Sequence, residues 1–286
     1  MDEWPALPYE QWRDTRDTLH MYTQVIGKVR LALSPLEPQW ANVPLYVTAR
    51  GLTTSPVPFG LRTVDAEFDL ISHRLVLRTS DGGTERIELA PRAVADFYRD
   101  VLDALARLGV DVTISGSPSE VNDPIPFAVD RTHHSYDREQ INRYFHILSQ
   151  VDILLKEHRA RFLGRTSPAQ FFWGTFDLAL TRYNGRPAEP HGDNVIMRRS
   201  TDAEQICAGW WPGDERVSAP AFFAYAYPKP DGIEREDGWD DAIGEFLLPY
   251  EDVRTASDPR RALLDWLART YGTAARLGGW NEDLLG

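Results

Sequence analysis

A histidine and a glutamine one helical turn apart occur twice in this chain, each time inside an apolar stretch. His20 is followed by Gln24, and 126 residues later His146 is followed by Gln150. Histidine is the side chain whose ordinary pKa best suits proton transfer near neutral pH. The pattern predicts that His20 and His146 act as general acid or base residues and that Gln24 binds a ligand beside them. A pair of structural histidines is the alternative interpretation.

A second candidate group lies in residues 171–181, where apolar and polar positions alternate. The period of two predicts a strand with Trp173, Thr175 and Asp177 on one face. Apolar area with a few polar groups is typical of the wall of a binding cleft. We therefore expect Trp173 to contact the ligand and Asp177 to orient it or exchange protons with it. A half-exposed sheet face is the alternative.

Five further residues complete the candidate site. Glu245 lies between apolar neighbours, where burial would give the carboxyl a raised pKa suited to acid/base chemistry; an edge-strand glutamate in water is the alternative. Arg50 is expected to anchor an anionic group of the ligand. Tyr225 and Tyr227 share a strand face, and with Trp211 they are expected to line the pocket.

The sequence predicts neither a metal nor a nucleotide cofactor. Cys207 is the one cysteine, which excludes an internal disulfide and a Cys-based zinc site. His191 and Asp193 have the His-x-Asp spacing of a facial-triad iron site, but that site needs a second histidine downstream and His191 is the last in the chain. Gly-rich phosphate-binding motifs and the G-x-S-x-G nucleophile elbow are absent from the sequence.

The elements that must position these residues form two similar series. Apolar spacings of three and four predict a helix over residues 9–33, and a second helix is expected from Pro91 to about Leu108. Helices that bracket runs of strands predict an α+β fold with antiparallel sheets. The first half has expected strands over residues 43–54, 65–71, 74–79, 86–89 and 110–115; the second has helices over 137–163 and 259–277 and strands over 170–183, 204–211, 220–227 and 244–250.

The order helix, antiparallel strands, helix in both halves predicts an internal duplication. Its sequence signals are the paired His/Gln segments and the similar helix ends at Gly109 and Gly278. We expect a first α+β half over residues 1–116, a turn-rich linker over 117–136 and a second α+β half over 137–286. The two halves form either two sheets or one pseudo-twofold unit.

The charge balance excludes several kinds of partner. The formal net charge is −12 and the basic residues form no run, whereas nucleic-acid binding requires clustered positive charge. A membrane surface that attracts basic segments is excluded for the same reason. The acidic N-terminus has no apolar signal segment, so we expect a cytoplasmic protein. The oligomeric state stays open.

Four motifs make the chain resemble a bacterial family known as a domain of unknown function, DUF5996. The resemblance covers nearly the whole length and implies one unit about the size of this chain; it implies no activity, cofactor or catalytic residue. The motifs are Asp17-Thr18-Leu19-His20-Met21, Val43-Pro44-Leu45-Tyr46-Val47-Thr48-Ala49-Arg50-Gly51-Leu52, Phe171-Phe172-Trp173-Gly174-Thr175-Phe176-Asp177-Leu178-Ala179 and Gly244-Glu245-Phe246-Leu247-Leu248-Pro249-Tyr250.

These observations favour a small-molecule enzyme with an aromatic-lined cleft that performs acid/base chemistry without a metal or nucleotide. Two alternatives stay open. One is a small-molecule-binding protein with the same cleft and no turnover. The other is a structural or interaction protein whose aromatic surface contacts a partner chain.

Overall fold

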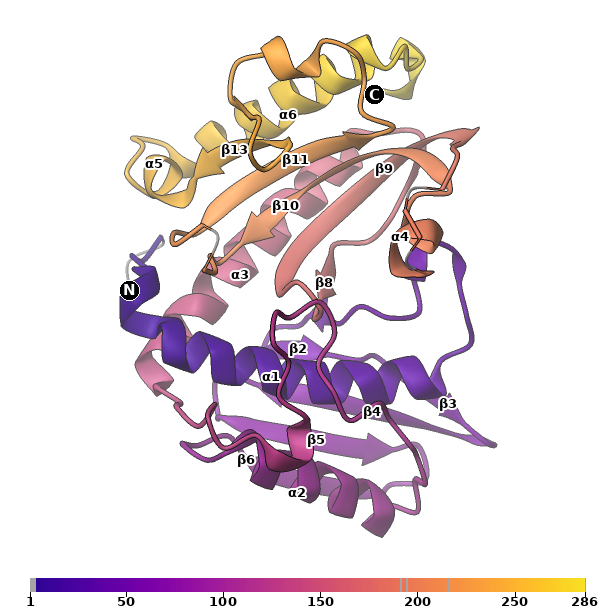
Figure 1. Ribbon diagram of the computed structural model, residues 1–286, viewed down its shortest axis with the longest axis vertical. Helices are drawn as coiled ribbons and strands as arrows, with labels where there is room; N and C mark the ends of the chain where they lie inside the picture. Colours follow the sequence, from indigo (N-terminus) through magenta and orange to yellow (C-terminus); the bar gives the residue numbers. More distant parts are fainter. Residues whose placement is uncertain (1–3, 191, 194, 216, 286) are drawn as a thin grey trace.

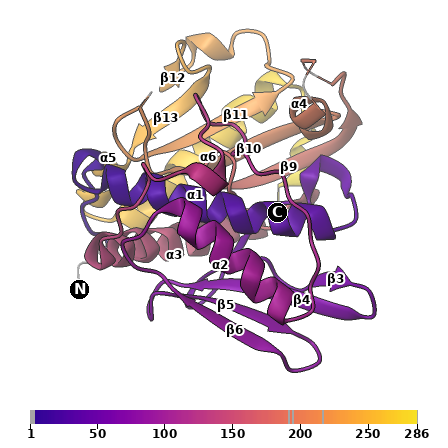
Figure 2. The same cartoon turned by 60° about the horizontal axis from the view of Figure 1, so that its bottom comes forward.

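The computed structural model describes residues 4–190, 192–193, 195–215 and 217–285. It has the expected α+β architecture, with two antiparallel sheets of six and seven strands. The first helix, α1 (Tyr9–Leu33), has the bounds that the apolar spacing predicts. Figures 1 and 2 show α1 lying between the two sheets, so that one helix packs against both halves of the chain.

The six-stranded sheet forms the first half. Its strands follow one another in the order β1-β2-β4-β5-β6, and β3 pairs with β4. Residues alternate along β4, so that Val64, Ala66 and Phe68 face the core while carboxylates face outward. Helices α1 and α2 cover the apolar face, where the rings of Tyr22 and Phe97 stack at 4.0 Å. The elements are β1 (Tyr46–Val47), β2 (Gly51–Thr53), β3 (Val57–Phe59), β4 (Arg62–Asp69), β5 (Arg74–Thr79), β6 (Thr84–Glu88), α2 (Val94–Arg107) and the 3-10 turns η1 (Pro38–Trp40) and η2 (Phe127–Val129).

The seven-stranded sheet forms the second half, in the order β12-β13-β11-β10-β9-β7, with β8 paired to β9. Helices α3 and α6 cover one face of it (Figure 1). The elements are α3 (Arg138–Ala160), β7 (Arg165–Thr166), β8 (Gln170–Phe172), β9 (Asp177–Pro187), α4 (Val195–Ser200), β10 (Ala203–Trp211), β11 (Ala221–Tyr227), η3 (Ile233–Arg235), β12 (Trp239–Asp240), β13 (Glu245–Pro249), α5 (Tyr250–Arg254), α6 (Pro259–Leu277) and η4 (Glu282–Leu284).

The two sheets meet at one backbone bridge. The amide of Leu45 donates to the carbonyl of Phe171 over 2.9 Å, and the amide of Phe171 donates to the carbonyl of Leu45 over 2.8 Å. Both side chains are fully buried. The apolar core runs through this junction and includes residues of both halves, so the sheets are separate in topology and joined in packing.

Three expected strands differ in the structure. Residues 43–54 form the β1–β2 hairpin, because the Thr48 hydroxyl accepts the amides of Arg50 and Gly51 and closes a turn. Residues 170–183 also form a hairpin, with the amide of Phe176 donating to the carbonyl of Phe172 over 2.7 Å. Residues 110–115 are in no strand of the described chain.

None of the helices in the described chain combines the length and the apolar character needed to cross a bilayer.

Candidate functional site

His20 is buried against the turn that joins β8 to β9. Its Nε2 lies 3.0 Å from the carbonyl oxygens of both Trp173 and Gly174. The amide nitrogen of Gln24, a donor, lies 3.2 Å from the same ring nitrogen. The tautomer with the proton on Nε2 satisfies both carbonyls, and in it the Gln24 amide donates elsewhere. Burial, and then the Arg16 guanidinium, lower the pKa of His20 to about 3, so the imidazole is neutral at physiological pH. His20 therefore fixes the 173–176 turn in place.

The next two turns of α1 hold a loop of the expected linker. The Gln24 side chain donates to the carbonyl of Ser119 over 2.8 Å and accepts its amide over 3.0 Å. Lys28 Nζ donates to the Ser119 hydroxyl over 2.8 Å. Both side chains are buried, so the stripe His20, Gln24 and Lys28 is an interior contact and not a solvated face.

The Trp173 ring packs against α1 at Gly27, where the absence of a side chain makes room for it. A Cβ at Gly27 would lie 2.3 Å from the indole ring. The indole donates from Nε1 to the carbonyl of Val43 over 3.0 Å, and Lys28 Nζ lies 5.5 Å from the ring centroid. Trp173 is thus a buried packing residue at the junction of the halves.

Two carboxyl groups lie near this turn, and the charge of one acts on the other. A Cβ at Gly174 would lie 1.9 Å from Glu120 Oε2, so the absent side chain leaves room for the Glu120 carboxyl. Burial raises the pKa of Glu120, and Lys28 opposes this shift. Burial also raises the pKa of Asp177 to about 7; the Thr175 hydroxyl, which donates to the Asp177 carboxyl, opposes this shift, and the charge of Glu120 reinforces it. The Asp177 carboxyl is therefore harder to ionise than that of an ordinary aspartate.

Asp177 also marks the edge of a second apolar cluster, on the sheet face opposite to α3 and α6. In the ladder Asp177 is paired with Phe172, and both residues lie on the same face as Ala179. No helical residue belongs to this cluster within the described chain, and we call it the helix-free face. Its members are Phe172, Ala179, Cys207, Trp211, Val217, Phe223, Tyr225 and Leu247.

Polar groups stand among the aromatic rings of the helix-free face. Cys207 lies between Thr181 and Tyr225 in the ladder. Burial raises the pKa of the Cys207 thiol to about 12, although the Thr181 and Tyr225 hydroxyls act to lower it. The neighbouring Cys207, burial and the charge of Glu245 raise the pKa of the Tyr225 phenol well above its ordinary value. The thiol is therefore protonated and is not a nucleophile.

The structure thus brings together two groups of the expected site residues. His20, Gln24, Trp173 and Asp177 surround the 173–176 turn. Trp211, Tyr225 and Glu245 lie near each other on or beside the helix-free face, since Tyr225 and Glu245 act on each other electrostatically. Asp177 belongs to both groups.

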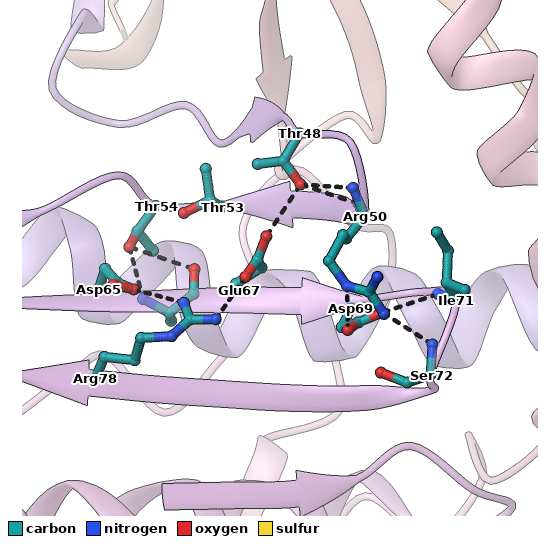
Figure 3. Close-up of polar contacts among 12 residues, drawn as sticks. Thr48, Arg50, Thr53, Thr54, Asp65, Glu67, Asp69, Ile71, Ser72 and Arg78 are labelled. Carbon is teal, nitrogen blue, oxygen red and sulfur yellow. Dashed lines mark hydrogen bonds and ion pairs between the residues drawn. The ribbon is translucent and has the colours of Figure 1, made fainter. Parts of the chain in front are cut away.

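The remaining expected residues lie elsewhere. Arg50 donates to Asp69 over 2.6 Å on the outer face of the six-stranded sheet, beside the ion pairs of Arg78 with Asp65 and Glu67 (Figure 3). This ion pair joins the start of β2 to the end of β4 and is not part of the Asp177 group. Tyr227 directs its hydroxyl to the carbonyl of Glu189. The buried Nε2 of His146 has no hydrogen-bond partner in the described part of the chain.

Sequence reasoning missed Glu120 and Ser119, because they lie in a segment without periodicity. Lys28 did carry a signal, since it follows Gln24 by one further helical turn. Sequence reasoning also missed the pair of Asp130 and His133. The buried Asp130 carboxylate accepts a hydrogen bond from His133 Nδ1 over 2.7 Å and raises the pKa of the imidazole.

No group of three or more potential metal ligands occurs among the described residues, and the possible iron ligand His191 lies outside them. Two cavities, of about 460 and about 230 Å³, lie near the C-terminal end of α3 and beside β9. Neither is lined by Asp177 or by the helix-free face.

Comparison with known proteins places the chain in one family. The model of a family of unknown function, DUF5996, matches residues 4–286. The chain belongs to this family. No curated protein and no solved structure matches it.

Proposed function

For this member of DUF5996 we propose an enzyme that binds a small organic molecule on the helix-free face and exchanges a proton with it through Asp177. The position of Asp177 is the observation that carries the proposal. It stands at the edge of the aromatic cluster, on the same face, with the Glu120 carboxyl beside it.

Neighbouring carboxyl groups in an apolar setting are a recurrent device for acid/base chemistry. Burial disfavours the charged form of Asp177, and the charge of Glu120, an exposed residue of the neighbouring loop, disfavours it further. A carboxyl that titrates near pH 7 can both donate and accept a proton at that pH. Thr175 contributes by donating a hydrogen bond that orients the Asp177 carboxyl.

The remaining groups suit binding better than bond cleavage. Phe172 and Leu247 are half-buried and offer apolar area over the buried rings of Trp211 and Phe223. The half-buried Tyr225 phenol offers a hydrogen bond that would fix the ligand's orientation. In this proposal the aromatic cleft is the helix-free face together with Glu120 on its loop. Glu245 assists by keeping the phenol of Tyr225 protonated.

His20 takes a different role from acid/base catalysis in this proposal. Its Nε2 proton is engaged by two backbone carbonyls, and its low pKa opposes protonation. We assign it as a positioning residue for the turn that carries Asp177. Arg50 and His146 take no part in the proposed site.

A small-molecule-binding protein without turnover is the second candidate. The engagement of His20 favours it, because it removes one acid/base group from the site. The two candidates share the ligand surface and differ in the role of Asp177.

The test is incubation of the purified protein with a metabolite extract, followed by mass spectrometry of the extract and of the protein-bound fraction. The enzyme predicts that at least one compound is consumed by the wild type, and that Asp177→Asn retains its binding but loses turnover. Tyr225→Phe is expected to weaken binding of that compound, whereas Tyr98→Phe, on α2, serves as the matched control. Retention of a compound without conversion by the wild type identifies the binding protein. If no compound is retained or consumed, the site is wrong.

A further inference from the structure

An open cavity of about 460 Å³ lies between the last turn of α3 and strand β7, and Asp177 is not among its lining residues. Its lining includes Lys156, Arg159 and Arg165 together with the Thr166 hydroxyl, and it includes no carboxylate. Three cations at one cavity are unusual in a chain with a net charge of −12.

The local acids leave part of this positive charge unbalanced. Lys156 Nζ pairs with Asp152 over 2.5 Å. Arg159 donates from Nε to the Thr166 hydroxyl over 2.6 Å, and neither Arg159 nor Arg165 has an ion pair with any other described residue. The C-terminal end of α3 contributes roughly half a negative charge. A surplus of more than one positive charge therefore stays at the cavity.

Further cations lie close to the cavity. Arg182 lies behind the cavity wall, with its guanidinium carbon 5.0 Å from the centroid of the Phe162 ring, which lines the cavity. Burial, and then the charges of Arg182 and Arg161, lower the pKa of His158 to about 3. The protein thus disfavours another cation at this end of α3.

We propose that this cavity binds the phosphate group of a small molecule, at a site separate from the proposed Asp177 centre. Arginine guanidinium groups present paired N–H donors that match phosphate oxygens, and lysine adds a point charge. The Nη groups of Arg159, the guanidinium of Arg165 and the Lys156 ammonium would contact the phosphate oxygens.

The neighbouring cavity indicates what the rest of the ligand would meet. It has a volume of about 230 Å³, shares Arg165 with the first, and is lined by Tyr183, Arg186 and Gln39, whose amide nitrogen donates to Asp202 over 2.7 Å. Amide and phenol groups can hydrogen-bond to hydroxyl groups of an organic moiety. A phosphate monoester therefore fits the two cavities better than the free ion does.

The test is isothermal titration calorimetry with inorganic phosphate and with glycerol 3-phosphate, at about 150 mM salt so that diffuse surface attraction is screened. Saturable binding is expected for the wild type. Arg165→Gln should weaken it by about tenfold, as expected for the loss of charge-assisted hydrogen bonds worth about 1.4 kcal/mol. The double variant Arg159→Gln/Arg165→Gln should abolish it.

Arg269→Gln is the matched control, because Arg269 is exposed on α6 and lines neither cavity. It should leave the affinity unchanged. Thermal melting of each variant establishes that it is folded. Tighter binding of the ester supports a phosphorylated small molecule, and equal binding supports phosphate itself as the ligand. The proposal is overturned if neither probe binds saturably. It is also overturned if the folded Arg165→Gln and double variants bind with the affinity of the wild type.

Discussion

Leu45 and Phe171 pair with each other through both hydrogen bonds of an antiparallel bridge, and they are 126 positions apart in the sequence. His20 and His146 have the same separation. A two-fold axis that relates two halves must pass between residues that pair with their own counterparts. The bridge therefore joins the two halves at positions with the same separation as the His/Gln segments, and an internal duplication stays a prediction.

The two histidines nevertheless have different environments. His20 donates to the carbonyls of the 173–176 turn, whereas the buried Nε2 of His146 has no such partner among the described residues. Of the two expected histidines, only His20 therefore contacts the turn of the candidate site.

Gly27 is the residue that allows α1 to approach Trp173. Gly27→Ala should destabilise the protein by about 2 kcal/mol or more, because the new Cβ would lie 2.3 Å from the indole. Gly272→Ala, on α6, is the control, since no atom lies within 4 Å of a Cβ there. It should stabilise by about 0.5–1 kcal/mol through helix propensity. Urea denaturation measures both, and equal effects would contradict this packing.

Asp69 should stabilise the β4–β5 turn in its charged form. Burial acts to raise its pKa, but Arg50 and the Ser72 groups outweigh this and lower the pKa to about 2 (Figure 3). A carboxyl with a depressed pKa contributes stability above its ordinary pKa of 3.8, and that contribution is lost as pH falls through 2.

Asp69→Asn should therefore cost about 1–2 kcal/mol at pH 7, and the difference from the wild type should disappear near pH 2. Glu88 lies on the same sheet as Asp69 and forms an exposed ion pair with Arg138 of α3. Glu88→Gln removes this pair and should change stability by less than about 0.5 kcal/mol. Urea titrations across this pH range measure both variants. A pH-independent loss for Asp69→Asn would show that charge is not the cause.

The sequence predicts elements well where the pattern is long and misses them where a tertiary contact decides. Helix α1 follows from its apolar spacing over 25 residues. The turn at 173–176 has no such signal, because Phe176 takes a left-handed backbone conformation with φ of 63° that bulky residues rarely adopt. Its ring is fully buried against Tyr144 and Phe171, so packing stabilises a turn that local preference opposes.

The same reason separates the expected site residues from the observed ones. Tyr225 could be chosen because alternation along β11 fixes its face. The expected shared face of Trp173 and Asp177 is wrong, because the 173–176 turn breaks the strand and places Trp173 in the core, while Asp177 keeps the face of Ala179. Glu120 could not, because its position depends on Gln24 and Lys28 holding the preceding residue, Ser119. Arg50 was assigned to a continuous strand, and the turn at Thr48 instead directs it to Asp69.

Gln24 should control the loop that carries Glu120. Gln24→Leu removes both hydrogen bonds to the Ser119 backbone. Hydrogen exchange of residues 116–126 should accelerate by about tenfold, which corresponds to about 1.4 kcal/mol of lost local stability. Gln150→Leu, at the equivalent position of α3, is the control and should leave this exchange unchanged. Equal acceleration by both variants would show global loosening.

The pH dependence of stability tests the environment of Asp177 without knowledge of a substrate. Its folded-state pKa of about 7 exceeds the ordinary value of 3.8 because burial and Glu120 disfavour the charge. A carboxyl with a raised pKa stabilises the fold fully below pH 3.8, and this contribution is lost as pH rises through 7. Asp177→Asn has no charge to bury, so it should keep its stability over that range. Relative to the wild type, the variant should gain about 1–3 kcal/mol between pH 4 and pH 8, measured by urea denaturation.

Asp265→Asn, at an exposed position of α6, should show no such gain. If wild type and Asp177→Asn respond to pH in parallel, the Asp177 carboxyl is solvated, and it cannot be the proton-exchanging group of this site.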